Sequence, residues 1–184
     1  MAERWNICPP TGTLLVGPPG TGKSLLARLV ATQSHRSFYP VTAAEILGGH
    51  VGDSVKKLNA VFERAKENSP SIVFFDELDG LLPSTRQGFL NQHDIQLVEE
   101  CLIQISTLLP ENNVFLIGTS NHLDQIDPRV LRGGRFSEKI HIELPSKAIR
   151  HRLLLKCLDG IQTSPSLRME ELVTMSEGLS CADI

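Results

Sequence analysis

Short apolar runs alternate along the chain with longer segments in which apolar residues recur every three or four positions. The runs have the length of buried strands and lie at 13–16, 72–75 and 114–118. Two further strands are predicted at 38–42, which contains the unfavourable Pro40, and at 139–144, which alternates apolar and polar residues as a more exposed strand does. The periodic segments have the spacing of one face of a helix and lie at 23–30, 54–67 and 94–109. This alternation predicts successive β-α units and a parallel sheet, and therefore an α/β protein.

The pattern changes after Pro145, where only helical segments follow. We therefore predict a large α/β domain over residues 1–145 and a small helical domain over 146–184. Because the last predicted helix has barely begun at Ile184, we expect the helical domain to be incomplete. The helical segments after Pro145 lie at 148–158, at 169–175 and from Ser180 onward.

The composition is that of a globular protein, with 41% hydrophobic and 21% charged residues among 184. The formal net charge of -3 argues against a protein that coats nucleic acid, because neutralising phosphates needs a basic surplus. The N-terminus lacks the apolar stretch of a signal peptide, and no apolar run approaches the roughly 20 residues that span a bilayer. With four cysteines and no CxxC pair, we expect an intracellular, cytoplasmic protein without a membrane segment.

The motif that carries most chemistry is residues 17–24, GPPGTGKS, which match GxxxxGK[ST] between a predicted strand and a predicted helix. Glycines allow the backbone to curl so that successive N–H groups point at phosphate oxygens, and the helix N-terminus adds its positive dipole end. In such a loop, Lys23 reaches the β- and γ-phosphates and the Ser24 hydroxyl ligates Mg²⁺. The candidate nucleotide-binding residues are Gly17, Pro18, Pro19, Gly20, Thr21, Gly22, Lys23, Ser24 and Leu25.

Two acidic residues, Asp76 and Glu77, follow the apolar run at 72–75. Because ligands of parallel sheets bind at the carboxyl ends of the strands, we expect Asp76 beside the phosphate-binding loop. There Asp76 orients Mg²⁺ or its water shell, and Glu77 polarises the attacking water as a general base. The alternative is an acidic helix N-cap after a strand, which the loop upstream disfavours.

Polar and basic residues also follow the run at 114–118. Asn121 stands just past this predicted strand, where its amide is placed to hold the γ-phosphate or the lytic water, although asparagine there is also a common turn residue. Arg132 and Arg135 flank a Gly-Gly pair, and arginine is suited to stabilise charge on a transferring phosphoryl group. The alternative for both arginines is a solvated loop.

Taken in order, the segments GPPGTGKS, IVFFDELD, LIGTSN, IDPRVLRGGRF and GLSCADI resemble an AAA ATPase, of the AAA clade within the AAA+ superfamily. The pattern is similar to the valosin-containing-protein, proteasome-ATPase and katanin-like groups. The resemblance implies a three-layer α/β/α domain with a five-stranded parallel sheet, followed by a small helical lid. It also implies a homo-oligomeric ring, usually hexameric, with ATP bound at the interfaces between subunits.

The resemblance assigns further roles. Asn121 corresponds to the sensor-1 residue, and Arg132 and Arg135 correspond to the arginine fingers that reach the γ-phosphate of the neighbouring subunit. A polypeptide-gripping pore loop aligns with residues 48–54, in which His50 and Val51 are the candidates and His50 replaces the usual aromatic ring. In the lid, Cys157 and Cys181 depart from the family pattern, while Leu153 and Ala182 are the expected neighbours of adenine.

The favoured hypothesis is an Mg²⁺-dependent ATP hydrolase whose ring couples turnover to the unfolding or remodelling of proteins. A nucleotide-gated assembly module without turnover is the first alternative. A nucleic-acid motor or loader is the second, and the acidic balance of charge argues against it.

Overall fold

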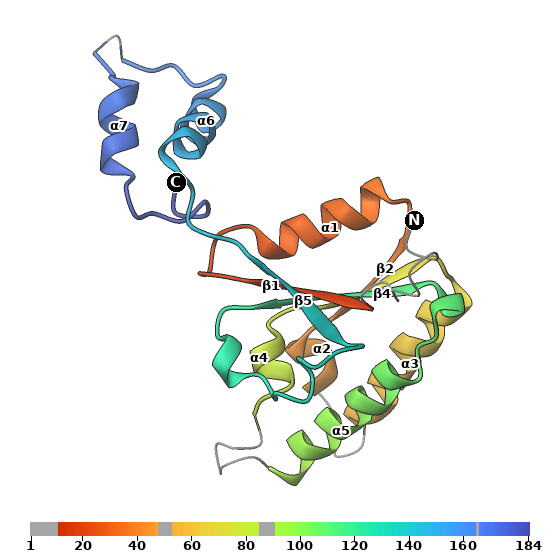
Figure 1. The fold of residues 1–184 in the computed structure, drawn as a ribbon. Coiled ribbons are helices and arrows are strands. Elements are labelled where there is room, and N and C mark those ends of the chain that lie inside the picture. The colour runs from red at the N-terminus through yellow and green to blue at the C-terminus, as the bar shows by residue number, and fades with distance from the viewer. Residues whose placement is uncertain (1–10, 48–52, 85–90, 165) are drawn as a thin grey trace, which may run out of the picture.

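The computed structural model describes residues 11–47, 53–84, 91–164 and 166–184. Its sheet has five strands, all paired in parallel, in the order β2-β3-β4-β1-β5 (Figure 1). This confirms the α/β class and the five-stranded parallel sheet. The strands are β1 (Gly12–Val16), β2 (Ser37–Val41), β3 (Ser71–Phe75), β4 (Val114–Ser120) and β5 (Phe136–His141).

Helices cover both faces of the sheet, which gives the expected three layers. Figure 1 shows α1 on one face and α3 and α5 on the other. The helices predicted between the strands are present with small shifts of their ends, and β5 begins at Phe136 rather than Lys139. The helices of the sheet region are α1 (Lys23–Gln33), α2 (Ala43–Leu47), α3 (Asp53–Glu67), α4 (Leu78–Leu81) and α5 (Gln92–Ser106), with 3-10 turns at Pro110–Asn112 and Leu123–Gln125.

The larger part of the core lies between the sheet and the α3–α5 face. Phe75 of β3 packs there between Phe62 of α3 and Phe136 of β5, with ring centroids 6.2 and 5.8 Å away. Every residue of β3 is buried, as expected of a central parallel strand covered on both faces. This buried centre holds the carboxyl end of β3, where the two acids follow.

Helix α1 packs on the opposite face through small side chains. Ala27 and Ala31 are buried against the sheet, where they join a second cluster with Ile72 and Phe74 of β3. The leucines and the valine whose spacing predicted this helix are exposed instead. They are Leu25, Leu26, Leu29 and Val30. Alanines lie against the strands because they let a helix approach a sheet closely.

The helices α6 (Lys147–Leu158) and α7 (Met169–Met175) pack on each other beside the sheet region (Figure 1). The buried guanidinium of Arg150 joins them, because its nitrogens donate to the carbonyl oxygens of Pro145 and Val173 and to the Ser176 hydroxyl. The last residues form a turn rather than the helix predicted to begin at Ser180. They return to the loop at 17–24, where Ala182 N–H donates to the Gly20 carbonyl oxygen at 3.0 Å.

Candidate active site

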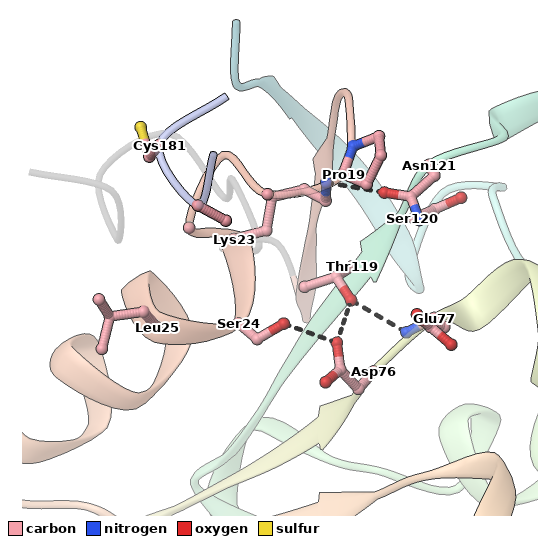
Figure 2. A pocket seen from close by; sticks show the side chains of 13 residues that line it. Pro19, Lys23, Ser24, Leu25, Asp76, Glu77, Thr119, Ser120, Asn121 and Cys181 are labelled. Atoms are coloured by element: carbon pink, nitrogen blue, oxygen red, sulfur yellow. Dashed lines mark hydrogen bonds between the residues drawn. The ribbon is translucent and has the colours of Figure 1, made fainter. Parts of the chain in front are cut away.

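A cavity of about 420 Å³ lies at the carboxyl ends of β3 and β4, beside the N-terminus of α1 (Figure 2). This is the edge of a parallel sheet at which ligands bind. The C-terminal turn closes one side of the cavity. Its lining residues are Pro19, Gly20, Gly22, Lys23, Ser24, Leu25, Asp76, Glu77, Thr119, Ser120, Asn121, Cys181 and Ala182.

Three glycines allow the loop before α1 to take its shape. Gly20 and Gly22 have φ of 72° and 91°, in the left-handed region where a side chain is strained. A Cβ atom at Gly17 would overlap the carbonyl oxygen of Ile142, and one at Gly20 would overlap the hydroxyl of Ser180. Gly22 is the N-cap residue of α1 and carries no capping side chain, so the first-turn N–H groups suit an anion.

The Lys23 side chain is buried and held by three oxygen atoms. Its Nζ donates to the carbonyl oxygens of Gly17 (2.8 Å) and Pro18 (2.7 Å) and to Oδ1 of Asn121 (2.8 Å). Desolvation lowers the pKa of Lys23, while the nearby carboxylates, above all that of Asp76, act in the opposite direction. The structure thus brings the predicted lysine and the predicted asparagine into direct contact.

A chain of hydrogen bonds joins the loop to the acidic pair (Figure 2). Oγ of Ser24 donates to Oδ1 of Asp76 at 2.8 Å, and the hydroxyl of Thr119 donates to the same oxygen at 2.7 Å. The Glu77 N–H donates to the Thr119 hydroxyl at 3.0 Å. Hydroxyl and carboxylate oxygens are the ligands that Mg²⁺ prefers, so Ser24 and Asp76 fit this ion.

Glu77 lies between β3 and α4 in an unusual backbone conformation. Its φ and ψ are 53° and 60°, in the left-handed region, and it is the N-cap residue of α4. Its carbonyl oxygen accepts from the Gly80 N–H at 2.9 Å. A non-glycine residue in this region marks local strain, which proteins concentrate at functional sites. The exposed side chain of Glu77 lines the cavity.

The two predicted finger arginines do not line the cavity of their own chain. Arg132 is exposed at the surface. Arg135 is half-buried and donates to the carbonyl oxygen of Arg129 at 2.6 Å and to the Ser106 hydroxyl at 3.0 Å. Arg129 in turn forms ion pairs with Asp127 and Glu99. The role of Arg132 and Arg135 as arginine fingers stays a prediction.

The remaining predicted residues divide into three groups. Ala182 lines the cavity and Thr21 stands in the loop, where its hydroxyl donates to the Pro18 carbonyl oxygen at 2.9 Å. Leu153 lies on α6 and lines a separate hollow, so its contact with adenine stays a prediction. The pore-loop candidates His50 and Val51 lie outside the described residues.

Sequence reasoning did not assign a role to Thr119 or Ser120, although both line the cavity. The Ser120 hydroxyl accepts the N–H of His122 at 3.0 Å, which closes the turn after β4. The signal in the sequence is the change from apolar to small polar side chains at the carboxyl end of β4. Both residues are nonetheless buried, as expected for polar groups with hydrogen-bond partners.

Residues 13–144 match the model of the family described as "ATPase family associated with various cellular activities (AAA)". The chain is similar to the proteasome-activating nucleotidase of Sulfurisphaera tokodaii, with 39% identity over 97% of this chain and 46% of that protein. It is 36% identical to the cell division cycle protein 48 homolog of Archaeoglobus fulgidus, over 99% of this chain and 25% of that protein. A third relative is the ATP-dependent zinc metalloprotease FtsH 4 of Sphaerobacter thermophilus, with 38% identity over 95% of this chain and 27% of that protein.

The chain spans less than half the length of each of these relatives. Within residues 11–47, 53–84, 91–164 and 166–184, no helix is both long and apolar enough to cross a membrane. The same described residues contain no group of three or more His, Cys, Asp or Glu side chains that could hold a metal ion.

Proposed function

Because the chain belongs to the AAA family of ATPases, we propose that its cavity binds ATP together with Mg²⁺ and hydrolyses the terminal phosphate. The observation that carries this proposal is that Lys23, Asp76, Glu77 and Asn121 all line one cavity of about 420 Å³. These residues come from three separate segments of the chain, and together they supply a cation, a metal ligand, a base and an amide. Each of these groups has a role in phosphoryl transfer to water.

The loop before α1 binds the phosphates in this proposal. Its backbone N–H groups and the N-terminus of α1 surround the triphosphate, and Lys23 exchanges the carbonyl oxygens of Gly17 and Pro18 for phosphate oxygens. Ser24 and Asp76, 2.8 Å apart, hold the metal ion or its water shell. When bound, Mg²⁺ neutralises charge on the β- and γ-phosphate oxygens.

Glu77 and Asn121 handle the water. The Glu77 carboxylate accepts a proton from the water that attacks the γ-phosphate, as a general base. Asn121 holds that water or a γ-phosphate oxygen through its amide. Leu25 lines the cavity, and the expected adenine neighbours, Ala182 beside the cavity and Leu153 on α6, complete the nucleotide site.

Catalysis is completed by a neighbouring copy of the chain. Arg132 and Arg135 do not line the cavity of their own chain, and an arginine supplied in trans is worth about 10³–10⁵ in rate. The resemblance to AAA ATPases suggests a homo-oligomeric ring, usually hexameric, and oligomerisation is then part of the mechanism. A lone copy should hydrolyse ATP slowly.

We further propose that turnover remodels or unfolds a polypeptide, with His50 and Val51 in the gripping loop. The names of the relatives support this, since one is a proteasome-activating nucleotidase and another is an ATP-dependent protease. The division into a large domain, 1–145, and a helical lid, 146–184, belongs to the same proposal. No role for nucleic acid is proposed, because the net charge is -3.

The alternative is an assembly module that binds ATP without turnover. It is favoured by one observation, the two hydrogen bonds that tie Arg135 to Arg129 and Ser106 of its own chain. An arginine held in this way must leave two partners before it reaches a neighbouring γ-phosphate.

The test is steady-state ATP hydrolysis at rising protein concentration, with assembly followed by light scattering. We expect the specific activity to increase as copies assemble, and Lys23→Ala to abolish nucleotide binding. If specific activity stays at the level of Glu77→Gln while assemblies form, the module binds without turnover. If Lys23→Ala retains tight ATP binding, the loop is not the phosphate site.

A further inference from the structure

Thr119 forms hydrogen bonds with both acids of the site, Asp76 and Glu77. It is 2% exposed, near the carboxyl end of β4, and its hydroxyl lies between the two acids that follow β3. The hydroxyl contacts the side chain of Asp76 and the backbone N–H of Glu77. Figure 2 shows the hydroxyl at the centre of this cluster.

The direction of these hydrogen bonds follows from the chemistry of the groups. A backbone N–H only donates, so the Thr119 hydroxyl accepts from Glu77, at 3.0 Å. The single hydroxyl proton is then free to go to a carboxylate oxygen, and Oδ1 of Asp76 lies 2.7 Å away. The same oxygen accepts from Ser24 at 2.8 Å. Because Oδ1 belongs to a carboxylate, the bonds from Ser24 and Thr119 are stronger than bonds between neutral groups. The bond to Asp76 and the bond from Glu77 together fix the orientation of the Thr119 hydroxyl.

The bond to Glu77 acts on a strained residue. Glu77 has φ of 53°, which is unfavourable for a side chain with a Cβ atom. On one side its carbonyl oxygen accepts from Gly80, and on the other its N–H donates to Thr119. This conformation turns the chain from β3 into α4 and sets the direction in which the Glu77 side chain leaves the backbone.

From these contacts we infer that Thr119 is a positioning residue, which holds the metal-ligating carboxylate of Asp76 and the backbone of Glu77 in the geometry that hydrolysis requires. The inference rests on the proposed function for its consequence in turnover. A valine side chain has nearly the shape of threonine but neither accepts nor donates. Thr119→Val would therefore leave the Glu77 N–H and Oδ1 of Asp76 each without one partner.

A merely structural role predicts a different outcome. If Thr119 only fills space at the end of β4, Thr119→Val lowers the thermal unfolding temperature and spares the turnover of the folded protein. Losing the support of a metal-ligating or catalytic group typically costs 10- to 100-fold in activity or metal affinity. The two roles therefore separate in kcat.

The experiment compares Thr119→Val and Thr119→Ala with Thr119→Ser, which keeps the hydroxyl, and with Thr32→Val as the matched control. Thr32 lies in the last turn of α1, and its hydroxyl bonds only to the carbonyl oxygen of Arg28 among the described contacts. The measurements are kcat in assembled protein, the affinity for a fluorescent ATP analogue with Mg²⁺, and hydrogen exchange at the amide of Glu77. The amide of Leu116, which lies in β4 with Thr119, is the internal reference for exchange.

We expect kcat to fall about 10- to 100-fold in Thr119→Val and Thr119→Ala, with analogue affinity changed by no more than about threefold. The Glu77 amide should exchange at least about tenfold faster, because it has lost its acceptor, while Leu116 does not change. Thr119→Ser should restore both properties, and Thr32→Val should match the wild type.

Unchanged kcat and unchanged exchange at Glu77 would overturn the inference. So would a loss in Thr119→Val that Thr119→Ser shares in full. If the assembled wild type hydrolyses ATP no faster than background, the proposed function has failed, and exchange at the Glu77 amide still decides whether Thr119 holds this backbone.

Discussion

Nζ of Lys23 lies 2.8 Å from Oδ1 of Asn121, although the two residues stand 98 positions apart. An ammonium group only donates, so the amide of Asn121 must present its oxygen to Lys23. Its NH₂ group is thereby left as a donor. In the proposed site, a donor beside Lys23 suits a γ-phosphate oxygen or the oxygen of the attacking water. Lys23 therefore sets the orientation of the amide that the proposed reaction uses.

Asn121→Asp tests this orientation. The substitution removes the NH₂ donor. The new carboxylate would pair with Lys23 and repel the γ-phosphate, so we expect ATP affinity to fall at least about tenfold. The nucleotide-free protein should be no less stable than the wild type. Isothermal titration and thermal unfolding measure the two effects. Asn68→Asp makes the same charge change at the exposed end of α3, and equal losses of affinity in the two variants would contradict the assignment.

Lys23→Met tests the desolvation of the ammonium group. Burial lowers the pKa of Lys23 in the folded protein from its ordinary value of 10.5. Between the lowered pKa and 10.5 the unfolded chain binds more protons than the folded chain, so the stability contributed by this site rises with pH. At pH values below that window, Lys23 is charged in both states, and the folded protein bears the full desolvation cost of the buried ammonium group.

We therefore expect the unfolding free energy of the nucleotide-free wild type, relative to Lys23→Met, to increase as pH is raised through this window. Urea unfolding at a series of pH values measures it, and the difference cancels the other titrating groups. Lys57→Met, which removes an exposed ammonium from α3, is the reference. A wild-type advantage that shrinks with rising pH would show that the sign is wrong.

Glu77→Gln separates binding from chemistry. The amide keeps the size of the side chain but cannot accept a proton from water, so we expect ATP affinity within about threefold of wild type and a loss in kcat of about 10²–10⁴. Rapid filtration should then recover ATP rather than ADP on the protein. Glu67→Gln, at the exposed end of α3, is the matched control. ADP recovered from Glu77→Gln at the wild-type rate would remove Glu77 from the role of base.

Much of the fold could be predicted because its central elements carry local signals. Residues 72–75 are all apolar, and this run forms β3, which is buried along its whole length. The loop at 17–24 combines glycines with Lys23 between a strand and a helix, and its shape follows from that composition. These features depend on residues that are adjacent in the sequence, so they can be predicted from one sequence alone.

Other features depend on contacts between distant segments. The parallel register that pairs Phe75 with Gly118 brings Thr119 beside Asp76, and no spacing within either segment reports it. The buried face of α1 was not predictable either, because closeness to the sheet favours Ala27 over the larger Leu29. The hydrogen bonds of Arg135 to Arg129 and Ser106 likewise appear only in three dimensions.

Arg132→Ala tests catalysis across an interface. The exposed guanidinium is free to reach a neighbouring γ-phosphate, so we expect assembled Arg132→Ala protein to lose about 10³-fold or more in kcat and to keep its ATP affinity. Arg135→Ala should also lose stability, because it removes two hydrogen bonds of its own chain. Arg168→Ala, which removes an exposed arginine near α7, is the control.

Mixing two inactive variants gives the sharper result. Glu77→Gln protein keeps its arginines but lacks the base, and Arg132→Ala protein keeps the base but lacks one arginine. Where the two alternate in an assembly, Glu77 of one copy meets Arg132 of the other, and one competent site forms per such interface. We therefore expect turnover to reappear on mixing and to be greatest near equal amounts. Mixtures of Glu77→Gln with the double variant Glu77→Gln/Arg132→Ala should stay inactive, because no copy in them has the base. A mass measurement shows whether mixed assemblies form. If they form and the mixture stays as inactive as its components, Arg132 does not act on the site of a neighbouring copy.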